Sequence, residues 1–224
     1  LFDEFHERSL DGDLGLALSL DVQGALREDL RLVPMSATID ASGIAQLLGN
    51  APVIESKGRS FPVETRYLGR VQNERIKHQI ARAVQQAIRE ESGSVLVFLP
   101  GQGEIKRTAD LLAGKVAPNC QITPLYGGLD SKAQDAAIRP ANDGSRKIVL
   151  ASAIAQTSLT IEGVRVVIDS GLARVPKYEP QTGITRLETV RVSRASADQR
   201  RGRAGRTKTG VCYRLWDEAQ TVSL

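Results

Sequence analysis

Short apolar runs alternate with stretches of helical periodicity along most of the 224-residue chain. Continuous apolar runs bounded by polar residues are typical of strands buried on both faces of a parallel sheet. Their alternation with helices predicts an α/β fold with a mostly parallel sheet. We predict strands at residues 30–35, 63–68, 95–99, 147–151, 164–169 and 211–215.

Helical spacing of apolar residues fills most of the intervals between these runs. We predict a long helix over residues 74–90, whose apolar face consists of Ile76, Ile80, Val84, Ala87 and Ile88. Such a face usually packs on a core. Shorter helices are predicted at residues 40–48, 103–112 and 131–138.

Two segments depart from this alternation. Residues 57–62 are polar, contain Gly58 and Pro62, and separate two α/β patterns, which makes them the best candidate for a linker. Residues 174–192 hold two extended runs around the turn-forming residues 180–183, and this arrangement predicts a β-hairpin.

Composition excludes some classes of protein. Hydrophobic residues make up 41% and charged residues 25%, as in ordinary globular domains. No apolar run approaches the ~20 residues that a membrane helix needs. Cys120 and Cys212 lie in no CxxC or His-rich setting, so we expect no zinc site. Two unmatched thiols are typical of a cytoplasmic protein.

Positive charge is concentrated near the C-terminus, although the net charge is only +4. Residues 191–206 contain six arginines and a single acid, Asp198. A solvated basic face would explain the charge, but the spacing favours a phosphate site. A helix capped by Ser196 would place Arg203 and Arg206 on one face, where they could neutralise a phosphoryl group in transfer. Gln199, a turn earlier, could orient water, and the glycines would allow close packing on a neighbouring domain.

Asp3 and Glu4 follow the apolar pair Leu1-Phe2, which looks like the end of a buried strand. We therefore expect the chain to be a piece of a longer protein. A strand end can deliver two carboxylates to a nucleotide, one to hold Mg²⁺ and one to deprotonate water. In isolation, a solvated acidic loop is the commoner explanation of such a pair.

Hydroxyl residues follow two other predicted strands. Ser36 and Thr38 come after the run at 30–35, where they could either sense a neighbouring loop or cap the next helix. A long loop rich in Ser and Thr follows the run at 147–151. Its hydroxyls and amides could bind a phosphate backbone, although an ordinary polar loop would look similar.

These segments, in this order, resemble motifs II, III, V and VI of the superfamily 2 helicases of the DEAH/DExH-box group. The sequences Asp-Glu-Phe-His-Glu-Arg at 3–8 and Phe-Leu-Pro-Gly-Gln-Gly-Glu-Ile at 98–105, a motif IV, are similar to the bacterial HrpB-type ATP-dependent helicases. The resemblance implies RecA-like (P-loop NTPase type) domains. Residues 1–58 would end a first domain, residues 59–216 would form nearly all of a second with a hairpin insertion, and residues 217–224 would begin the next region.

The resemblance also implies ATP and Mg²⁺ as cofactors, single-stranded RNA as a partner, and RNA translocation or unwinding as the activity. Asp3 would bind Mg²⁺ through water with Glu4 beside it at the metal, Glu4 would be the catalytic base, and Glu162 would face the ribose. Ser36 and Thr38 would couple hydrolysis to strand movement. The residues that would reach across a cleft to the γ-phosphate are Gln199, Arg203 and Arg206. Those that would contact RNA, with the hairpin, are Gly101, Gln102, Ser158 and Thr160.

The chain departs from the pattern of this group at several points. Ala153 and Gln156 stand where Asn and Glu are usual, and Arg139 stands where relatives carry an adenine-stacking aromatic. No GxxxxGK[ST] occurs, so the phosphate-binding loop is expected upstream in the same polypeptide, and we expect no ATP hydrolysis by this chain alone. A nucleic-acid-binding remodelling module with weak or lost ATPase, or a DNA-directed motor, stays open as an alternative.

Overall fold

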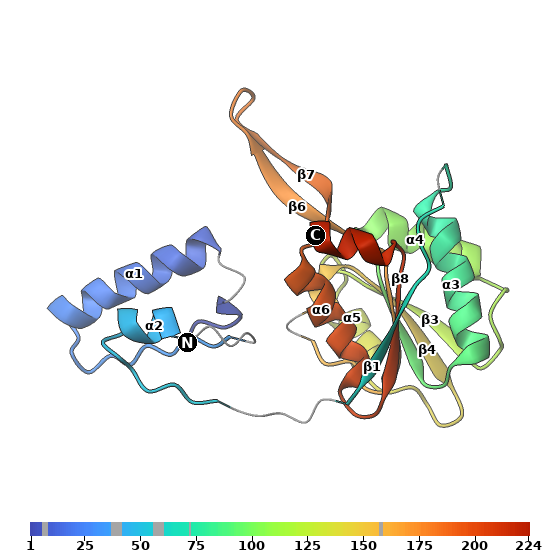
Figure 1. The fold of residues 1–224 in the computed structure, drawn as a ribbon, viewed down its shortest axis with the longest axis horizontal. Helices are drawn as coiled ribbons and strands as arrows, with labels where there is room; N and C mark the ends of the chain where they lie inside the picture. Colours follow the sequence, from blue (N-terminus) through green and yellow to red (C-terminus); the bar gives the residue numbers. More distant parts are fainter. Residues whose placement is uncertain (6–8, 37–41, 56–60, 72, 157–158) are drawn as a thin grey trace. The chain divides into compact units, whose positions relative to one another are not determined.

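The computed structural model describes residues 1–5, 9–36, 42–55, 61–71, 73–156 and 159–224 (Figure 1). The chain divides into two compact units, Leu1–Gly58 and Arg59–Leu224. Each unit is described by itself.

The second unit is built on a six-stranded sheet in the order β1-β8-β5-β2-β4-β3, in which all neighbouring strands are parallel. The predicted α/β fold with a parallel sheet is therefore confirmed. The strands are β1 (Val63–Tyr67), β2 (Ser94–Phe98), β3 (Cys120–Leu125), β4 (Arg146–Ala151), β5 (Val164–Asp169) and β8 (Gly210–Arg214). Edge strand β3 was not predicted, because its polar residues and Pro124 hide it from a search for apolar runs.

Helices cover both faces of this sheet (Figure 1). On one face, α3 (Ile76–Glu90) and α4 (Gln102–Leu112) bury Ile80, Val84 and Ile105 against alternate strand residues such as Val97. On the other face, α5 (Ser131–Ile138) and the 3₁₀ turns η2 (Ala153–Ala155) and η3 (Arg203–Gly205) pack against Phe98 and its neighbours. Because successive strand side chains point to opposite faces, one apolar run supplies both cores.

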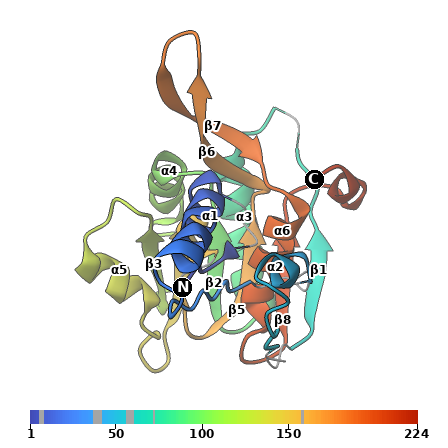
Figure 2. The same ribbon diagram turned by 90° about the vertical axis from the view of Figure 1, so that its left-hand side faces the viewer.

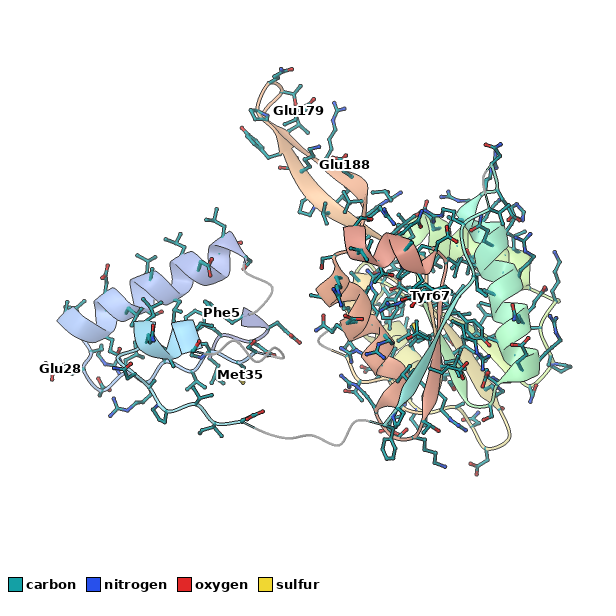
Figure 3. All side chains as sticks on the ribbon, in the orientation of Figure 1. Phe5, Glu28, Met35, Tyr67, Glu179 and Glu188 are labelled. Carbon is teal, nitrogen blue, oxygen red and sulfur yellow. The ribbon has the colours of Figure 1, made fainter. Side chains whose placement is uncertain are left out.

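A hairpin of β6 (Leu172–Glu179) and β7 (Ile184–Arg191) projects from this unit in both views (Figures 1 and 2), which confirms the predicted hairpin. Gly183 takes φ 65° in its turn, a conformation that favours glycine. Glu179 and Glu188 lie on the projecting part (Figure 3). Most hairpin side chains are exposed. After β8 the chain ends in a 3₁₀ segment, η4 (Glu218–Ser223).

The first unit contains α1 (Leu10–Ala25) and α2 (Ser42–Leu47). Our predicted strand at 30–35 is wrong in extent, since only an isolated parallel bridge between Phe2 and Pro34 forms there. Helix α1 was missed, although Ser9 caps it by accepting a hydrogen bond from the amide of Gly12. Its apolar residues do not gather on one face, so the pattern that revealed α3 is weak here.

Candidate nucleotide and nucleic-acid site

The arginine-rich segment folds as helix α6 (Arg194–Gly202) followed directly by the turn η3. The helix begins earlier than predicted: Ser193 is its cap, and the amide of Ser196 donates to the Ser193 hydroxyl. Arg203 and Arg206 do not share an α-helical face, because α6 ends before them. The glycines were expected to allow close packing on a neighbouring domain. Gly205 packs instead within the second unit, since a Cβ there would lie 2.5 Å from the Phe61 carbonyl oxygen.

The six arginines of this segment do not form one solvated face. Arg203 is buried, and its guanidinium donates to the backbone carbonyls of Gln156 and Leu159, the latter at 2.7 Å. Arg206 is exposed, and its Nη1 donates to the Thr160 hydroxyl at 2.6 Å. One short turn thus holds the loop that follows β4 through two arginines of opposite exposure.

The side chain of Gln156 joins this loop to α6. Its Oε1 accepts from the Ser196 hydroxyl at 2.8 Å and from Arg200 Nε at 3.1 Å. Its Nε2 donates to Gln199 Oε1 at 2.8 Å. The sequence marked Gln156 only as a departure from the usual Glu, and nothing in its spacing indicated these contacts.

A buried ion pair supports the same region. Arg200 Nη1 lies 2.9 Å from Asp169 Oδ1, and these side chains are 1% and 0% exposed. The guanidinium also lies over the Phe98 ring, 4.8 Å from its centroid. Asp169 was missed as a site residue, although an acid that ends a buried apolar run is a usable signal. Burial of the Cys212 thiol, and to a lesser extent the negative charge of Asp169, raises the pKa of Cys212 to about 12.

The residues predicted to contact RNA lie at two places in the second unit. Gly101 and Gln102 begin α4. The guanidinium of Arg174, at the base of the hairpin, lies against Gly101 and pairs with Glu104 at 3.5 Å. The second place is the loop after β4, where Thr160 accepts a hydrogen bond from Arg206 and the exposed Glu162 follows. Ser158 lies outside the described residues.

In the first unit, Asp3 and Glu4 lie where two segments run side by side. The Met35 amide donates to the Phe2 carbonyl and the Phe5 amide to the Met35 carbonyl, at 2.8 and 2.9 Å. Ser36 comes directly after Met35, the residue that bonds to Phe2 and Phe5 on either side of the acid pair. Thr38 lies outside the described residues. Glu4 has φ 51°, a left-handed conformation that is uncommon for a residue with a side chain and recurs at functional sites.

The acid pair fits a magnesium ion in its chemistry. Asp3 is exposed, and its Oδ1 accepts a hydrogen bond from the Glu4 amide at 2.8 Å. Hard carboxylate oxygens are the ligands that Mg²⁺ takes, commonly from one or two side chains with the rest supplied by water and phosphate.

Among the helices of the described residues, none is long and apolar enough to cross a membrane.

Residues 78–208 match the family model of the helicase conserved C-terminal domain. The chain belongs to this family. It is 53% identical over 215 residues to the ATP-dependent RNA helicase HrpB of Escherichia coli, a match that covers 96% of this chain and 27% of that protein. It is also 40% identical to the ATP-dependent RNA helicase HrpA of E. coli and 42% identical to the ATP-dependent RNA helicase DEAH11 of Arabidopsis thaliana. Both matches include the whole of this chain, but they cover only 17% of HrpA and 13% of DEAH11.

Solved structures agree with these relatives. Two crystal structures of E. coli HrpB superpose with TM-scores of 0.92 and 0.89, at 51% and 52% identity. They cover 98% of this chain, which spans about a quarter of their length (28% and 27%). The resemblance to DEAH/DExH-box helicases, and to the HrpB type among them, is therefore confirmed.

Proposed function

We propose that this chain is part of the motor of an ATP-dependent RNA helicase that moves along or unwinds RNA. The carrying observation is that Arg203 and Arg206, from one turn, hold the loop of Gln156 and Thr160. The loop proposed to contact RNA and the arginines proposed to contact phosphate then move together. In this proposal residues 1–58 end a first RecA-like domain, residues 59–216 form the second, and residues 217–224 begin the next region, in a cytoplasmic protein.

The two arginines take different parts in this proposal. Arg206 is exposed and carries a planar fork of donors, which suits a γ-phosphate whose charge develops in the transition state. Arg203, already bound to two carbonyls, ties that phosphate site to the loop. Gln199 lies one turn earlier and contributes to the same site, and Glu162 serves the ribose.

The first unit supplies the remaining chemistry. Asp3 would hold Mg²⁺, which neutralises phosphate charge when bound, and Glu4 would take the proton of the attacking water. Ser36, which follows the neighbouring segment, would couple hydrolysis to movement together with Thr38. RNA would be contacted by the start of α4 at Gly101 and Gln102, by Ser158 and Thr160, and by the hairpin.

The test is a set of arginine variants in the full-length protein that carries this chain. Arg206→Ala should lower kcat by about 10³–10⁵-fold at saturating RNA, and Arg206→Lys should rescue it poorly. The melting temperature should fall only slightly, because the hydrogen bond from Arg206 to Thr160 is exposed to solvent. Arg203→Ala should lower both kcat and the melting temperature, since it also releases the buried loop contacts.

Arg82→Ala is the matched control, because Arg82 is an exposed arginine of α3, paired with Glu74, on the opposite face of the sheet. It should leave kcat unchanged. A merely basic RNA-binding patch predicts the reverse for Arg206→Ala: weaker RNA affinity with a smaller salt dependence and a near-normal kcat. That result would overturn the proposal. Stimulation by DNA but not RNA would identify a DNA-directed motor.

A further inference from the structure

Four side chains form a continuous relay from the core of the second unit to the proposed phosphate site. Asp169 binds Arg200 at 2.9 Å, Arg200 Nε binds Gln156 at 3.1 Å, and Gln156 binds Gln199 at 2.8 Å. The first two members are buried, whereas Gln156 and Gln199 are half-buried. The relay therefore begins at a rigid charge pair and ends at a side chain that solvent can reach.

The chemistry of this relay has only one hydrogen-bonding solution. An arginine donates and never accepts, so the Gln156 atom that faces Arg200 must be its carbonyl oxygen. The Ser196 hydroxyl converges on the same oxygen, at 2.8 Å. The Gln156 NH₂ group must then face Gln199, which has to present its own carbonyl oxygen in return. The two ends of an amide point apart, so the Gln199 NH₂ group is directed away from Gln156.

We infer that Gln156 is a positioning residue that turns the Gln199 amide so that its NH₂ group, and not its carbonyl, faces the nucleotide. The inference rests on the proposed function. An NH₂ group directed at a triphosphate donates a charge-assisted hydrogen bond to a phosphate oxygen, which is stronger than a bond between neutral groups. It cannot accept a hydrogen bond from an attacking water. The contact with phosphate is the one that the resemblance implied for Gln199, and Gln199 can orient an attacking water only by donating to the oxygen of that water.

The identity of residue 156 decides this polarity. Glu at this position would still accept from Arg200 and Ser196, but both its oxygens would be acceptors. Gln199 would then have to turn its NH₂ group inward and its carbonyl outward. Gln156→Glu therefore reverses the Gln199 amide without altering the size of the side chain, and Gln156→Met keeps the size while removing all three side-chain hydrogen bonds.

Side-chain amide signals of the ¹⁵N-labelled 224-residue chain test the orientation directly. In the natural chain, the NH₂ protons of Gln156 should exchange with water about five- to tenfold more slowly than those of Gln199, as expected for one net hydrogen bond. In Gln156→Glu, the Gln199 NH₂ protons should become the slow pair. In Gln156→Met, they should exchange fast. Slow exchange of Gln199 in the natural chain would overturn the inference.

Nucleotide binding by the full-length protein provides the second arm. Gln156→Glu should raise the Kd for ATP on the order of tenfold and change kcat at saturating ATP much less, because a ground-state phosphate contact is lost. An unchanged Kd together with a reversed amide would overturn the contact with phosphate. If the natural protein binds no nucleotide while the exchange pattern holds, the proposed function fails and the amide orientation stands.

Discussion

The two units place their candidate functional residues on very different supports. In the second unit, Arg200 and Arg203 are buried among hydrogen bonds and rest on a sheet with a core on each face. In the first unit, only Phe5 and Leu16 are buried apolar residues within its described ranges, and Ile54 is 94% exposed. Backbone hydrogen bonds between two short segments hold Asp3 and Glu4. Substitutions in the buried network of the second unit should therefore affect stability as well as activity, and those at the acid pair only activity.

The largest effect is expected at Glu4. In the full-length protein, Glu4→Gln should lower ATP turnover by about 10²–10⁴-fold, as for a lost general base, with an unchanged melting temperature. Binding of Mg·ATP should persist, because the ion is assigned to Asp3. Parallel loss of binding and turnover in titration calorimetry and steady-state kinetics would show that the parts of Asp3 and Glu4 are assigned wrongly.

The buried Asp169–Arg200 pair should show the opposite pattern to Glu4, because its loss should lower the stability of the fold. Asp169→Asn leaves the Arg200 charge uncompensated in the core, so the free energy of unfolding of the chain should fall by about 3–5 kcal/mol in urea titrations. The control is Glu188→Gln, which breaks the exposed Lys177–Glu188 pair of 2.8 Å on the hairpin. That change should cost less than about 1 kcal/mol. Equal costs for the two variants would remove the contrast between buried and exposed networks.

Separating the units sharpens the comparison further. Residues 59–224 should fold alone with a free energy of unfolding within about 1 kcal/mol of the whole chain, because both large apolar clusters are made of their own residues. Residues 1–58 should stay largely unfolded in isolation, since so small a segment with so little buried surface cannot offset its chain entropy. Circular dichroism with urea titration checks both, and a cooperative transition of 1–58 would contradict the comparison.

The smallest effect concerns pH. Burial raises the pKa of Tyr213 to about 12 from its ordinary value of 10.0, with the Tyr213 hydroxyl also donating to Glu90. The folded chain therefore keeps this proton after the unfolded chain has lost it, and stability should fall as pH rises from about 10 to 12. Urea titrations across that range should show a shallower decline for Tyr213→Phe.

The raised pKa of Cys212 predicts, in addition, a thiol that stays unreactive at pH 8 until the chain unfolds.

Local pattern was enough for most of the second unit. The apolar runs located five of its six sheet strands, and the turn residues 180–183 located the hairpin, because burial on both faces and tight turns leave direct marks in the sequence. Pattern failed for β3, an edge strand that contains polar residues and Pro124, and for α1, whose apolar residues do not form one face. It also failed in the segment at 30–35, where a single bridge replaces the predicted strand.

The sequence by itself determined the family motifs, the parallel α/β architecture and the candidate residues from Asp3 to Arg206. It could not show that Arg203 is buried while Arg206 is exposed, since the two are the same residue type three positions apart. Nor could it pair Asp169 with Arg200, or Gln156 with Gln199, across 31 and 43 residues of chain. Those partners meet only because parallel strands bring β5, α6 and the loop after β4 together. Hydrogen-bond polarity is a property of such assembled contacts, so the identity of Gln156 sets the orientation of Gln199 only once tertiary structure has brought the two side chains together.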